Sequence, residues 1–571
     1  MTEPCVAAEN LEKLSQKTDE RPGFRGFLTG MVMFILGGCG LAYEYTFSKL
    51  ASDLLGNTVQ QWAIVIALML FAMGMGAELQ RHIRKERIAD RLIESQFLLA
   101  LFGGFGPIAL LAAFAFAPMH FALVQYGFCA LIGLLIGLEI PLIIRINESG
   151  SSDMRLNLAR VLKMDYIGAL VGALLWVFLL IKVFSITEIG FVLGLTTLAT
   201  AAFCLYLFRE HVQRPLRAQI LVGVGVLASL YGLASASKWT LHSEQALFRD
   251  KVILSKTTRY QHLVVTEGKN GNTHCYINGN LQFSSEDEFI YHENLVHPAM
   301  TLAPRRERVL ILGGGDGLAL REILKYPDVK EVVLVDIDPE MTRLAREDPW
   351  LTQMNHDSLA DARVTTMENQ ALKRGERYTL EATNQRVRFD READAAAELE
   401  ILHMDAATFV RQAAGRFHVA IIDFPDPNSP DLAKLYGLPF YQALKQRLTA
   451  DGIFVQQSTS PIHAKEAFLC IGRTMEAAGL AALPYHDNVP SFGEWGWWIG
   501  GAAELYRPEK LRSGLLGVEE VSVKTRYLTP ELIHASLHFG KAQLNTDETS
   551  ITTLTDSNVL QYYLQAWKAT H

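Results

Sequence analysis

The first 236 residues contain a succession of apolar runs, each long enough to cross a lipid bilayer. A hydrocarbon core about 30 Å thick requires roughly 20 residues of α-helix. Seven such runs follow one another, at residues 26–45, 59–79, 95–117, 120–143, 165–185, 187–208 and 217–236. They hold most of the apolar excess in a 571-residue chain that is 49% hydrophobic, and they predict a multi-pass α-helical membrane bundle.

The chain changes to an ordinary soluble mixture of residues after position 237. We expect a cytoplasmic N-terminal tail at 1–24, a transmembrane bundle of about seven helices at 25–237, a β-strand subdomain at 238–303 and an α/β domain at 304–571. The first apolar run is full length and lacks a small-residue cleavage site, so no cleavable signal peptide is expected.

Lysine and arginine in short loops favour the cytoplasm and so predict the orientation of the bundle. They gather between spans two and three, four and five, and six and seven, whereas the intervening loops carry Lys49 and Lys182. The N-terminus is therefore expected inside. Seven full crossings would then place everything after residue 237 outside.

Three acidic residues, Glu44, Glu139 and Asp165, lie within the predicted spans. Ionisable groups in a bilayer are costly and mark candidate pathways or internal pairs. The structural alternative is that they lie near helix ends or pair locally with Lys49, Arg145 or Lys163.

Cysteine spacing and net charge exclude several classes of partner. The six cysteines form no C-x-x-C pair, so neither a metal site nor a disulfide framework is predicted; they are Cys5, Cys39, Cys129, Cys204, Cys275 and Cys470. The net charge of −8 provides no basic excess for nucleic acid and suits a small cationic ligand better.

Strand-like and helix-like segments alternate in the soluble part. Residues 252–277 suggest a β-hairpin with a turn at KNGN. Apolar strands follow at 332–338, 398–405, 419–423 and 452–457. This alternation predicts a parallel, doubly wound sheet whose ligands bind beyond the carboxyl ends of the strands.

The stretch VLILGGGDGLAL, residues 309–320, has the form of a strand, a tight glycine turn and a helix. Asp336 ends the next strand 21 residues after Gly315, where an acid can bind ribose hydroxyls, and Asp405 ends a further strand, placed to meet an adenine edge. Nicotinamide dinucleotide and adenosylmethionine enzymes share these features. Asp316 inside the turn would repel a pyrophosphate and attract a sulfonium with an ammonium tail.

These motifs, in this order, resemble the polyamine aminopropyltransferase (spermidine synthase) family. The resemblance rests on Tyr260-Gln261, INGNLQFSSEDEFIYHENLVH at 277–297, LILGGGDG at 310–317 with Arg321-Glu322, VDID at 335–338 and IIDFPDP at 421–427. The stretch GLAYEYTFSKLASDLLG at 40–56 is similar to the membrane region fused to bacterial members. The implied fold is a helical membrane bundle followed by a class I methyltransferase-like Rossmann domain with a small N-terminal β-hairpin subdomain.

The resemblance implies a reaction and a set of site residues. An amine attacks the carbon beside the sulfonium of decarboxylated S-adenosylmethionine, the co-substrate, and no prosthetic group is implied. Asp423 matches the proton-accepting aspartate, and the glycine turn is Gly313, Gly314, Gly315 and Gly317. The implied substrate-binding residues are Gln261, Gln282, Tyr291, His292, Asp316, Asp336, Asp405, Asp426 and Gln457.

Two segments depart from the pattern of soluble members. The acidic loop has the sequence DFPDPN instead of a DSSDP-like one, and VPSFGEWGWW at 489–498 places Phe492 where a tyrosine is usual, with Glu494 as a candidate compensating charge. The identity of the amine therefore stays open. A charged insertion at about 368–400 has the character of a surface hairpin or lid.

Two other functions remain open: an S-adenosylmethionine-dependent N-methyltransferase of the same fold, and a polyamine transporter or sensor with a ligand-binding domain. The resemblance also makes a homodimer a candidate assembly. We expect the protein in the cell (inner) membrane. Because the nucleoside donor is made in the cytosol, a cytoplasmic catalytic domain is favoured, and the last apolar run is then a candidate re-entrant or interfacial segment.

Overall fold

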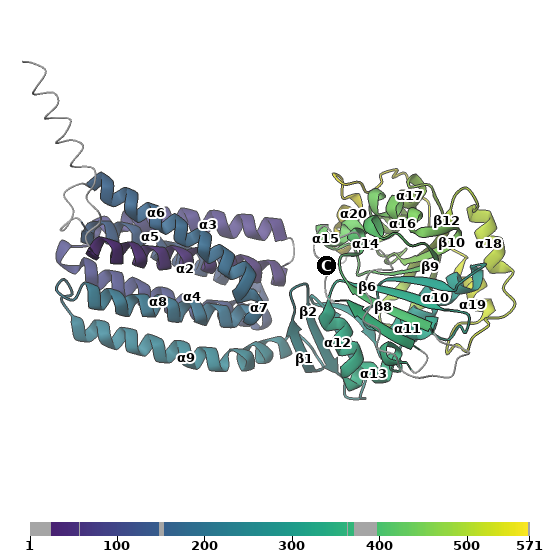
Figure 1. Cartoon of the computed structure of the whole chain (residues 1–571), viewed down its shortest axis with the longest axis horizontal. Helices are drawn as coiled ribbons and strands as arrows, with labels where there is room; N and C mark the ends of the chain where they lie inside the picture. The colour runs from purple at the N-terminus through teal and green to yellow at the C-terminus, as the bar shows by residue number, and fades with distance from the viewer. Residues whose placement is uncertain (1–23, 56–57, 148–153, 362–363, 370–396, 569–571) are drawn as a thin grey trace, which may run out of the picture. The chain divides into compact units, whose positions relative to one another are not determined.

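The computed structural model of the chain describes residues 24–55, 58–147, 154–361, 364–369 and 397–568 (Figure 1). The chain divides into two compact units, Met1–Val252 and Ile253–His571. The first unit is helical up to the start of β1 at Lys251, and the other eleven strands found in the described residues all lie in the second unit.

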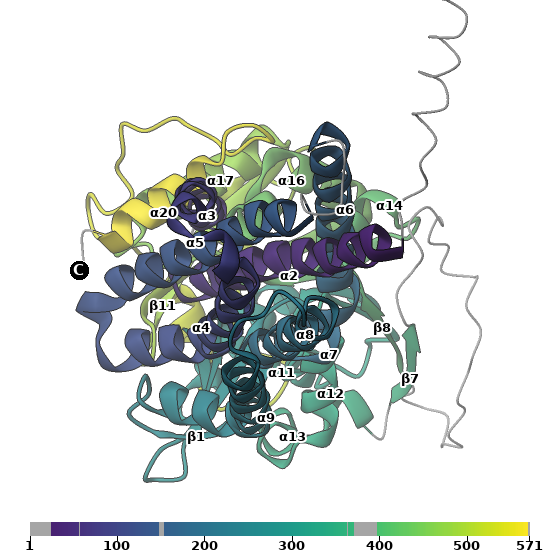
Figure 2. The ribbon, with the colours of Figure 1, turned by 90° about the vertical axis from the view of Figure 1, so that its left-hand side faces the viewer.

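The helical unit consists of long apolar helices. Its described residues include seven helical segments long and apolar enough to cross a membrane, which agrees with the predicted multi-pass bundle. The helices, drawn in Figures 1 and 2, are α2 (Phe24–Leu55), α3 (Thr58–Leu79), α4 (Ile88–Phe116), α5 (Phe121–Asn147), α6 (Met154–Leu175), α7 (Ile181–Val183), α8 (Ile186–Leu207) and α9 (Pro215–Gln245).

Glycines allow the backbones of neighbouring helices to approach closely. A Cβ atom on Gly168 of α6 would lie 1.9 Å from the carbonyl oxygen of Phe34 of α2, and one on Gly172 would lie 2.4 Å from that of Gly38. Small residues at such crossings bring helices into van der Waals contact, which in lipid replaces the hydrophobic effect as the source of helix association. The α2–α6 contact therefore depends on these glycines.

Two expectations for the spans need correction. The fifth predicted span, α6, begins at Met154, earlier than the apolar run at 165–185, because its first turns are polar. It continues through a π-helical segment, Trp176–Leu180, into α7. The last helix, α9, has 31 residues. Its length therefore offers no reason to treat it as a short re-entrant segment.

The local pairing considered for two of the acids within the spans is wrong. Lys49 pairs with Asp53, one turn further along α2. Arg145 donates to the backbone and side-chain oxygens of Gln80. Glu139 is 2% exposed, and one of its carboxylate oxygens has no hydrogen-bond partner among the described residues.

A four-stranded sheet begins the second unit. Its order is β1 (Lys251–Thr257), β2 (His262–Glu267), β3 (Thr273–Ile277) and β4 (Asn280–Ser284). The β2–β3 hairpin, predicted from the sequence, is antiparallel, and Gly271 takes φ +80° in its turn. A residue with a Cβ atom is disfavoured at such a φ, which accounts for glycine there.

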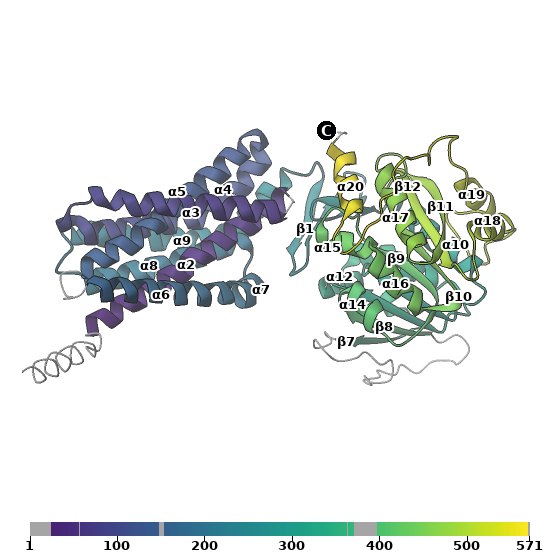
Figure 3. The same cartoon turned by 90° about the horizontal axis from the view of Figure 1, so that it is seen from above.

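The large sheet has eight strands in the order β11-β12-β10-β9-β5-β6-β8-β7, so that β7 and β8 lie at one edge and β11 and β12 at the other (Figure 3). Its bounds are β5 (Arg308–Gly313), β6 (Glu331–Asp336), β7 (Val364–Asn369), β8 (Ala397–His403), β9 (Phe417–Asp423), β10 (Leu448–Gln457), β11 (Leu480–Val489) and β12 (Gly493–Ala502). The four predicted strands are confirmed. The sheet is mixed rather than parallel, because β12 runs antiparallel to both β10 and β11.

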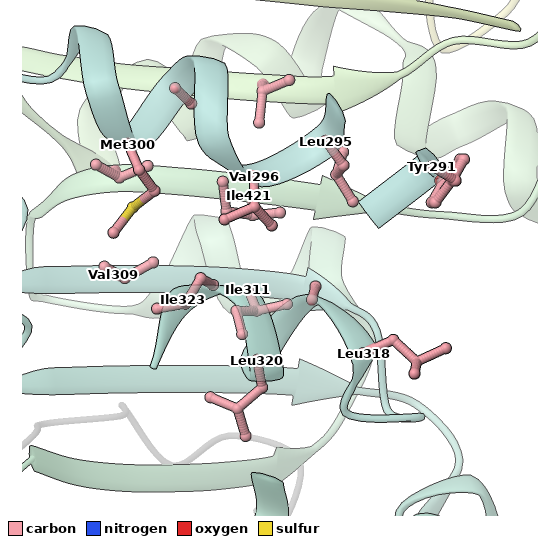
Figure 4. Packing of buried hydrophobic residues seen from close by; sticks show 14 of the residues in the cluster. Tyr291, Leu295, Val296, Met300, Val309, Ile311, Leu318, Leu320, Ile323 and Ile421 are labelled. Carbon is pink, nitrogen blue, oxygen red and sulfur yellow. The ribbon is translucent and has the colours of Figure 1, made fainter. Parts of the chain in front are cut away.

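Helices cover both faces of this sheet, so its central strands are apolar on both sides. Val309 and Ile311 of β5 belong to one buried cluster, and Leu310 and Leu312 to the other. In the first cluster, helix α10 (Glu288–Leu302) packs Leu295, Val296 and Met300 over the strands (Figure 4). This packing fixes α10 above the strand ends that carry the site.

The remaining helices of the unit are short. They are α11 (Leu318–Ile323), α12 (Pro339–Glu347), α13 (Pro349–Asn355), α14 (Ala406–Gln412), α15 (Pro430–Ala433), α16 (Leu438–Arg447), α17 (Lys465–Ala477), α18 (Pro508–Leu516), α19 (Pro530–Ser536) and α20 (Asn558–Lys568). The ends of the insertion at about 368–400 belong to β7 and β8, and its central part, 370–396, lies outside the described residues.

Candidate active site

The expected site residues gather at one edge of the large sheet. Strands β10, β9, β5, β6 and β8 are consecutive neighbours in it, and they run parallel. Their carboxyl ends carry Gln457 (β10), Asp423 (β9), the glycine turn with Asp316 (β5), Asp336 (β6) and Asp405 (β8). Residues spread over more than 140 positions are thus brought to one edge, the place where doubly wound folds bind ligands.

The glycine turn can follow its path because its residues have no side chains. Gly313, Gly314 and Gly317 have φ values of +84°, +65° and +80°. A Cβ atom on Gly313 would lie 2.0 Å from the carbonyl oxygen of Asp423, and one on Gly315 would lie 2.6 Å from Oδ2 of Asp336. The turn therefore brings β5 into backbone contact with its neighbours and leads Asp316 towards them.

Asp423 lies between Tyr291 and His292, two consecutive residues of α10. The Tyr291 hydroxyl donates a hydrogen bond of 2.6 Å to Oδ1 of Asp423, and Nε2 of His292 lies 4.0 Å from Oδ2. Burial raises the pKa of Asp423, and His292 and the Tyr291 phenol lower it by less. Burial and then the charge of Asp423 raise the pKa of Tyr291 well above its usual value, so this phenol remains a donor.

Asp316 completes a convergent group with His292 and Asp423. One ligand atom from each lies within 4.8 Å of the others, close enough to surround a single cation. Oδ1 of Asp316 accepts the backbone N–H of Leu318 at 2.8 Å. Burial raises the pKa of Asp316 to about 6, against the opposing effect of His292. Such a carboxylate ionises fully when a positive ligand arrives.

Asp426 accepts neutral donors from the last residue of β10 and from the segment that follows it. Nε2 of Gln457 lies 3.4 Å from Oδ1 of Asp426, and Oγ1 of Thr459 lies 3.3 Å from Oδ2. Thr459 takes φ +63°, a backbone conformation that β-branched residues rarely adopt. No local sequence pattern indicates this residue, because Thr459 and Asp426 follow different strands and meet only in the folded sheet.

Asp336 and Gln261 lie on the side of the glycine turn away from Asp423. Asp336 accepts backbone N–H groups of Gly315 at 2.9 Å and of Asp338 at 2.8 Å, and burial raises its pKa to about 7. The Gln261 side chain donates to Asp338 instead. Asp338, which we did not predict, thus joins the β1–β2 region to the end of β6.

Asp405 and Gln282 are engaged in other contacts. Asp405 caps α14 by accepting the Thr408 N–H at 2.8 Å, and it pairs with Lys434 at 2.9 Å. Burial opposes ionisation of Asp405, but the Lys434 ammonium and the Thr408 donors outweigh it and lower the pKa. Nε2 of Gln282 lies 3.2 Å from the carbonyl oxygen of Asn280, on its own strand.

A buried ionic network, which the sequence did not predict, supports His292. Its Nδ1 lies 3.0 Å from Oε2 of Glu288, and Arg321 makes a two-pronged contact with the same carboxylate at 2.8 and 2.9 Å. Arg321 also donates to Glu322, which contacts His297 at 2.9 Å. Burial opposes protonation of His292, but the Glu288 carboxylate outweighs it and raises the pKa. Arg321-Glu322, quoted with the glycine turn in the family resemblance, was the sequence feature that could have indicated this network.

In the second segment that departs from the family pattern, Phe492 directly precedes β12 and Glu494 is the second residue of β12, and their side chains lie on opposite sides of the sheet. Phe492 packs its ring 6.1 Å from that of Tyr291. Glu494 contacts Nδ1 of His486 on β11, on the face that carries Trp498, whereas Trp497 faces Tyr291 at 5.7 Å. Glu494 therefore does not supply a charge beside Tyr291.

The chain is similar to known proteins of one family. Residues 288–382 and 386–506 match the family model described as "Spermine/spermidine synthase domain". A protein named polyamine aminopropyltransferase 2 from Ralstonia nicotianae is 36% identical over 543 residues, 94% of this chain and 97% of that protein. A polyamine aminopropyltransferase from Oceanobacillus iheyensis is 34% identical over 539 residues, 94% of this chain and 96% of that protein.

The chain is also similar to solved structures of spermidine synthases. A spermidine synthase in complex with the transition-state analogue AdoDATO is 25% identical, with a TM-score of 0.40 over 51% of this chain and 88% of that chain. Spermidine synthase from Thermotoga maritima is 23% identical, with a TM-score of 0.39. The curated relatives, aligned over nearly their whole length, carry the assignment: the chain belongs to the polyamine aminopropyltransferase (spermidine synthase) family.

Proposed function

We propose that the protein transfers the aminopropyl group of decarboxylated S-adenosylmethionine to an amine such as putrescine, giving spermidine or a related polyamine and methylthioadenosine. One observation carries the proposal: Asp316, Asp423 and Asp426 converge at the strand ends, and their hydrogen-bond donors in the described part of the chain are a backbone amide, phenols, a carboxamide and a hydroxyl. Carboxylates that have no lysine or arginine partner among the described residues, with His292 as the basic group nearby, suit substrates that bring sulfonium and ammonium charges.

The reaction is a displacement at carbon. The amine nitrogen forms a bond to the carbon beside sulfur, the C–S bond breaks, and its electron pair leaves with sulfur as a neutral thioether. No acid is needed for that leaving group. An alkylammonium has a pKa near ~10 and must lose a proton to become a nucleophile. Oδ2 of Asp423 is the proposed acceptor, because Tyr291 occupies Oδ1.

The other residues align the two substrates. In this proposal Asp316 binds the ammonium of the aminopropyl group, while Asp336, Asp405, Gln261 and Gln282 hold the nucleoside. Asp405 and Gln282 would have to exchange their present contacts for ligand contacts. Tyr291, His292, Asp426 and Gln457 would line the path of the amine. Alignment supplies most of the rate enhancement, since held reactants avoid the entropy cost of meeting.

Product identification tests this function. The purified full-length protein is incubated with decarboxylated or intact S-adenosylmethionine and a panel of diamines, and products are identified by mass spectrometry. We expect methylthioadenosine and an amine extended by one aminopropyl group, from the decarboxylated donor. Adenosylhomocysteine formed from the intact donor would indicate an N-methyltransferase. Absence of turnover with either donor would reject both.

We propose a multi-pass protein of the cell membrane whose catalytic unit faces the cytoplasm, where the donor is made. Seven crossings from a cytoplasmic N-terminus would place it opposite, so this orientation requires an even number of crossings. A membrane-impermeant maleimide distinguishes the two. Lys269→Cys, on an exposed turn, should react after the cells are opened, like the control His211→Cys in a basic loop. Reaction of Lys269→Cys in intact cells would show that the catalytic unit faces the outside of the cell.

A further inference from the structure

The C-terminal helix α20 extends the catalytic unit beyond the matched family domain. That domain ends at residue 506, and α20 spans Asn558–Lys568. The segment before α20 is tied to α17: the Arg473 guanidinium donates to the Ser550 carbonyl at 3.0 Å, and the Thr552 N–H donates to the Thr474 hydroxyl at 3.1 Å. Figure 1 shows α20 beside α17. The helix therefore has a fixed position on the unit.

This position places Tyr563 against the site. Tyr563 is 8% exposed and lies in the same buried cluster as Phe424 and Tyr436, and its hydroxyl interacts with the carboxylate of Asp426. Trp567, one turn later, packs its ring 6.0 Å from that of Tyr563 and stacks on His463 at 6.3 Å. His463 belongs to the same segment after β10 that supplies Thr459. Two aromatic contacts thus hold the phenol where it meets Asp426.

We propose that Tyr563 is a positioning residue for the amine substrate, which holds the Asp426 carboxylate in place and ionised to receive an ammonium group of the diamine. This inference rests on the proposed function. It assigns a role in amine binding to a segment outside the family domain, 137 positions from Asp426 in the sequence.

The surroundings of Asp426 support this role. Among the described residues, the titratable groups that face Asp426 are phenols from three elements: Tyr291 of α10, Tyr436 of the 3-10 helix Lys434–Tyr436, and Tyr563 of α20. Burial raises the pKa of each phenol, so all three stay neutral. Burial raises the pKa of Asp426 to about 6, and Tyr563 is the largest of the influences that lower it, ahead of Gln457 and Thr459. The negative charge of Asp426 is therefore stabilised by neutral donors, and the carboxylate can still bind a cation.

Tyr563→Phe tests the inference, with Tyr562→Phe as its matched control. The Tyr562 hydroxyl donates to Glu548 at 2.6 Å, away from the site. A hydrogen bond to a charged group is worth a factor of roughly ten or more. For Tyr563→Phe we expect the KM and the calorimetric Kd for putrescine to rise about tenfold at pH 7 and further at pH 6, with the Kd for decarboxylated S-adenosylmethionine changed less than twofold. Tyr562→Phe should match the unaltered protein.

A double variant separates positioning from general packing. In the background of Asp426→Asn, Tyr563→Phe should have no further effect on amine binding, because the carboxylate is gone. An unchanged amine Kd in Tyr563→Phe, or equal losses for donor and amine, would overturn the inference. Putrescine binding without turnover would reject the proposed reaction and still test Tyr563 through Kd. No putrescine binding by the unaltered protein would reject both.

Discussion

Two groups of acids in the catalytic unit are bound in opposite ways. Glu288, Glu293 and Glu322, on α10 and α11, are at most 2% exposed, and each is matched by strong partners. Glu288 meets Arg321, Glu322 meets Arg321 and His297, and Glu293 accepts three consecutive backbone N–H groups beginning at Arg526. Asp316, Asp423 and Asp426, at the strand ends, have no ion pair with a lysine or arginine in the described part of the chain, whereas Asp405 at the end of β8 pairs with Lys434.

Asp316, Asp423 and Asp426 are only partly buried and are met by neutral donors, apart from His292 near Asp423. Burial raises their pKa values, whereas the paired Glu288 and Glu322 have lowered ones despite the same burial effect. A matched acid is kept ionised by its partners, and removal of a partner is destabilising, whereas an unmatched acid can bind a cationic ligand. The difference in partners and in pKa shifts therefore distinguishes structural acids from the acids that we propose bind substrate.

Asp423→Asn should have the largest effect on activity. The carboxamide keeps the shape and can still accept a hydrogen bond from Tyr291, but it cannot take the proton of the amine. Loss of such a proton acceptor lowers kcat on the order of 10²–10⁴-fold. Steady-state kinetics measures this, with donor binding followed by calorimetry and expected to change little. Retained turnover would show that Asp423 is not the proton acceptor and has a structural role instead.

Arg321→Met should have the largest effect on stability. It leaves Glu288 and Glu322 buried without their shared partner, a change that typically costs about 3–5 kcal/mol. The measurement is the denaturant midpoint of the full-length protein in detergent. Arg305→Met provides the control, because Arg305 pairs with Asp451 at the surface, and we expect no measurable shift there. Equal shifts of the denaturant midpoint in the two variants would show that the buried network of Glu288 and Glu322 does not have the structural role assigned to it.

The affinity for the donor should depend on pH through Asp316. With a pKa of about 6 in the free protein, Asp316 is largely ionised at pH 8 and about one-tenth ionised at pH 5. A cationic ligand binds the ionised form and lowers its pKa. Affinity for decarboxylated S-adenosylmethionine should thus fall about tenfold from pH 8 to pH 5, with protons released on binding near pH 6. Calorimetry in buffers of different ionisation enthalpy detects this release, and proton uptake near pH 6 would contradict it.

Glu494→Gln should have the smallest effect. Its carboxylate contacts His486 on the face of β12 away from Tyr291, so the KM for putrescine should change less than twofold. A rise in this KM of tenfold or more in the same kinetic assay would show that Glu494 takes part in amine binding.

Local patterns in the sequence determined much of the architecture. Uninterrupted apolar runs predict the long helices, because only a helix satisfies the backbone hydrogen bonds of such a segment in lipid. Apolar strands ending in Asp336 and Asp423, with a glycine turn between β5 and α11, predict a doubly wound sheet and the edge where its ligands bind. These signals depend on the spacing of residues within one element or between successive ones.

The tertiary structure alone decided which polar groups meet. Glu288 and Arg321 are 33 positions apart, and Asp426 and Thr459 are 33 apart as well, on segments that only packing brings together. The face of β12 that carries Glu494 depends on its antiparallel register with β11. Tyr563 reaches Asp426 because α20 packs on α17. A sequence encodes where an element turns or ends, but the charge environment of a buried acid is set by whichever distant side chains the close-packed interior places beside it.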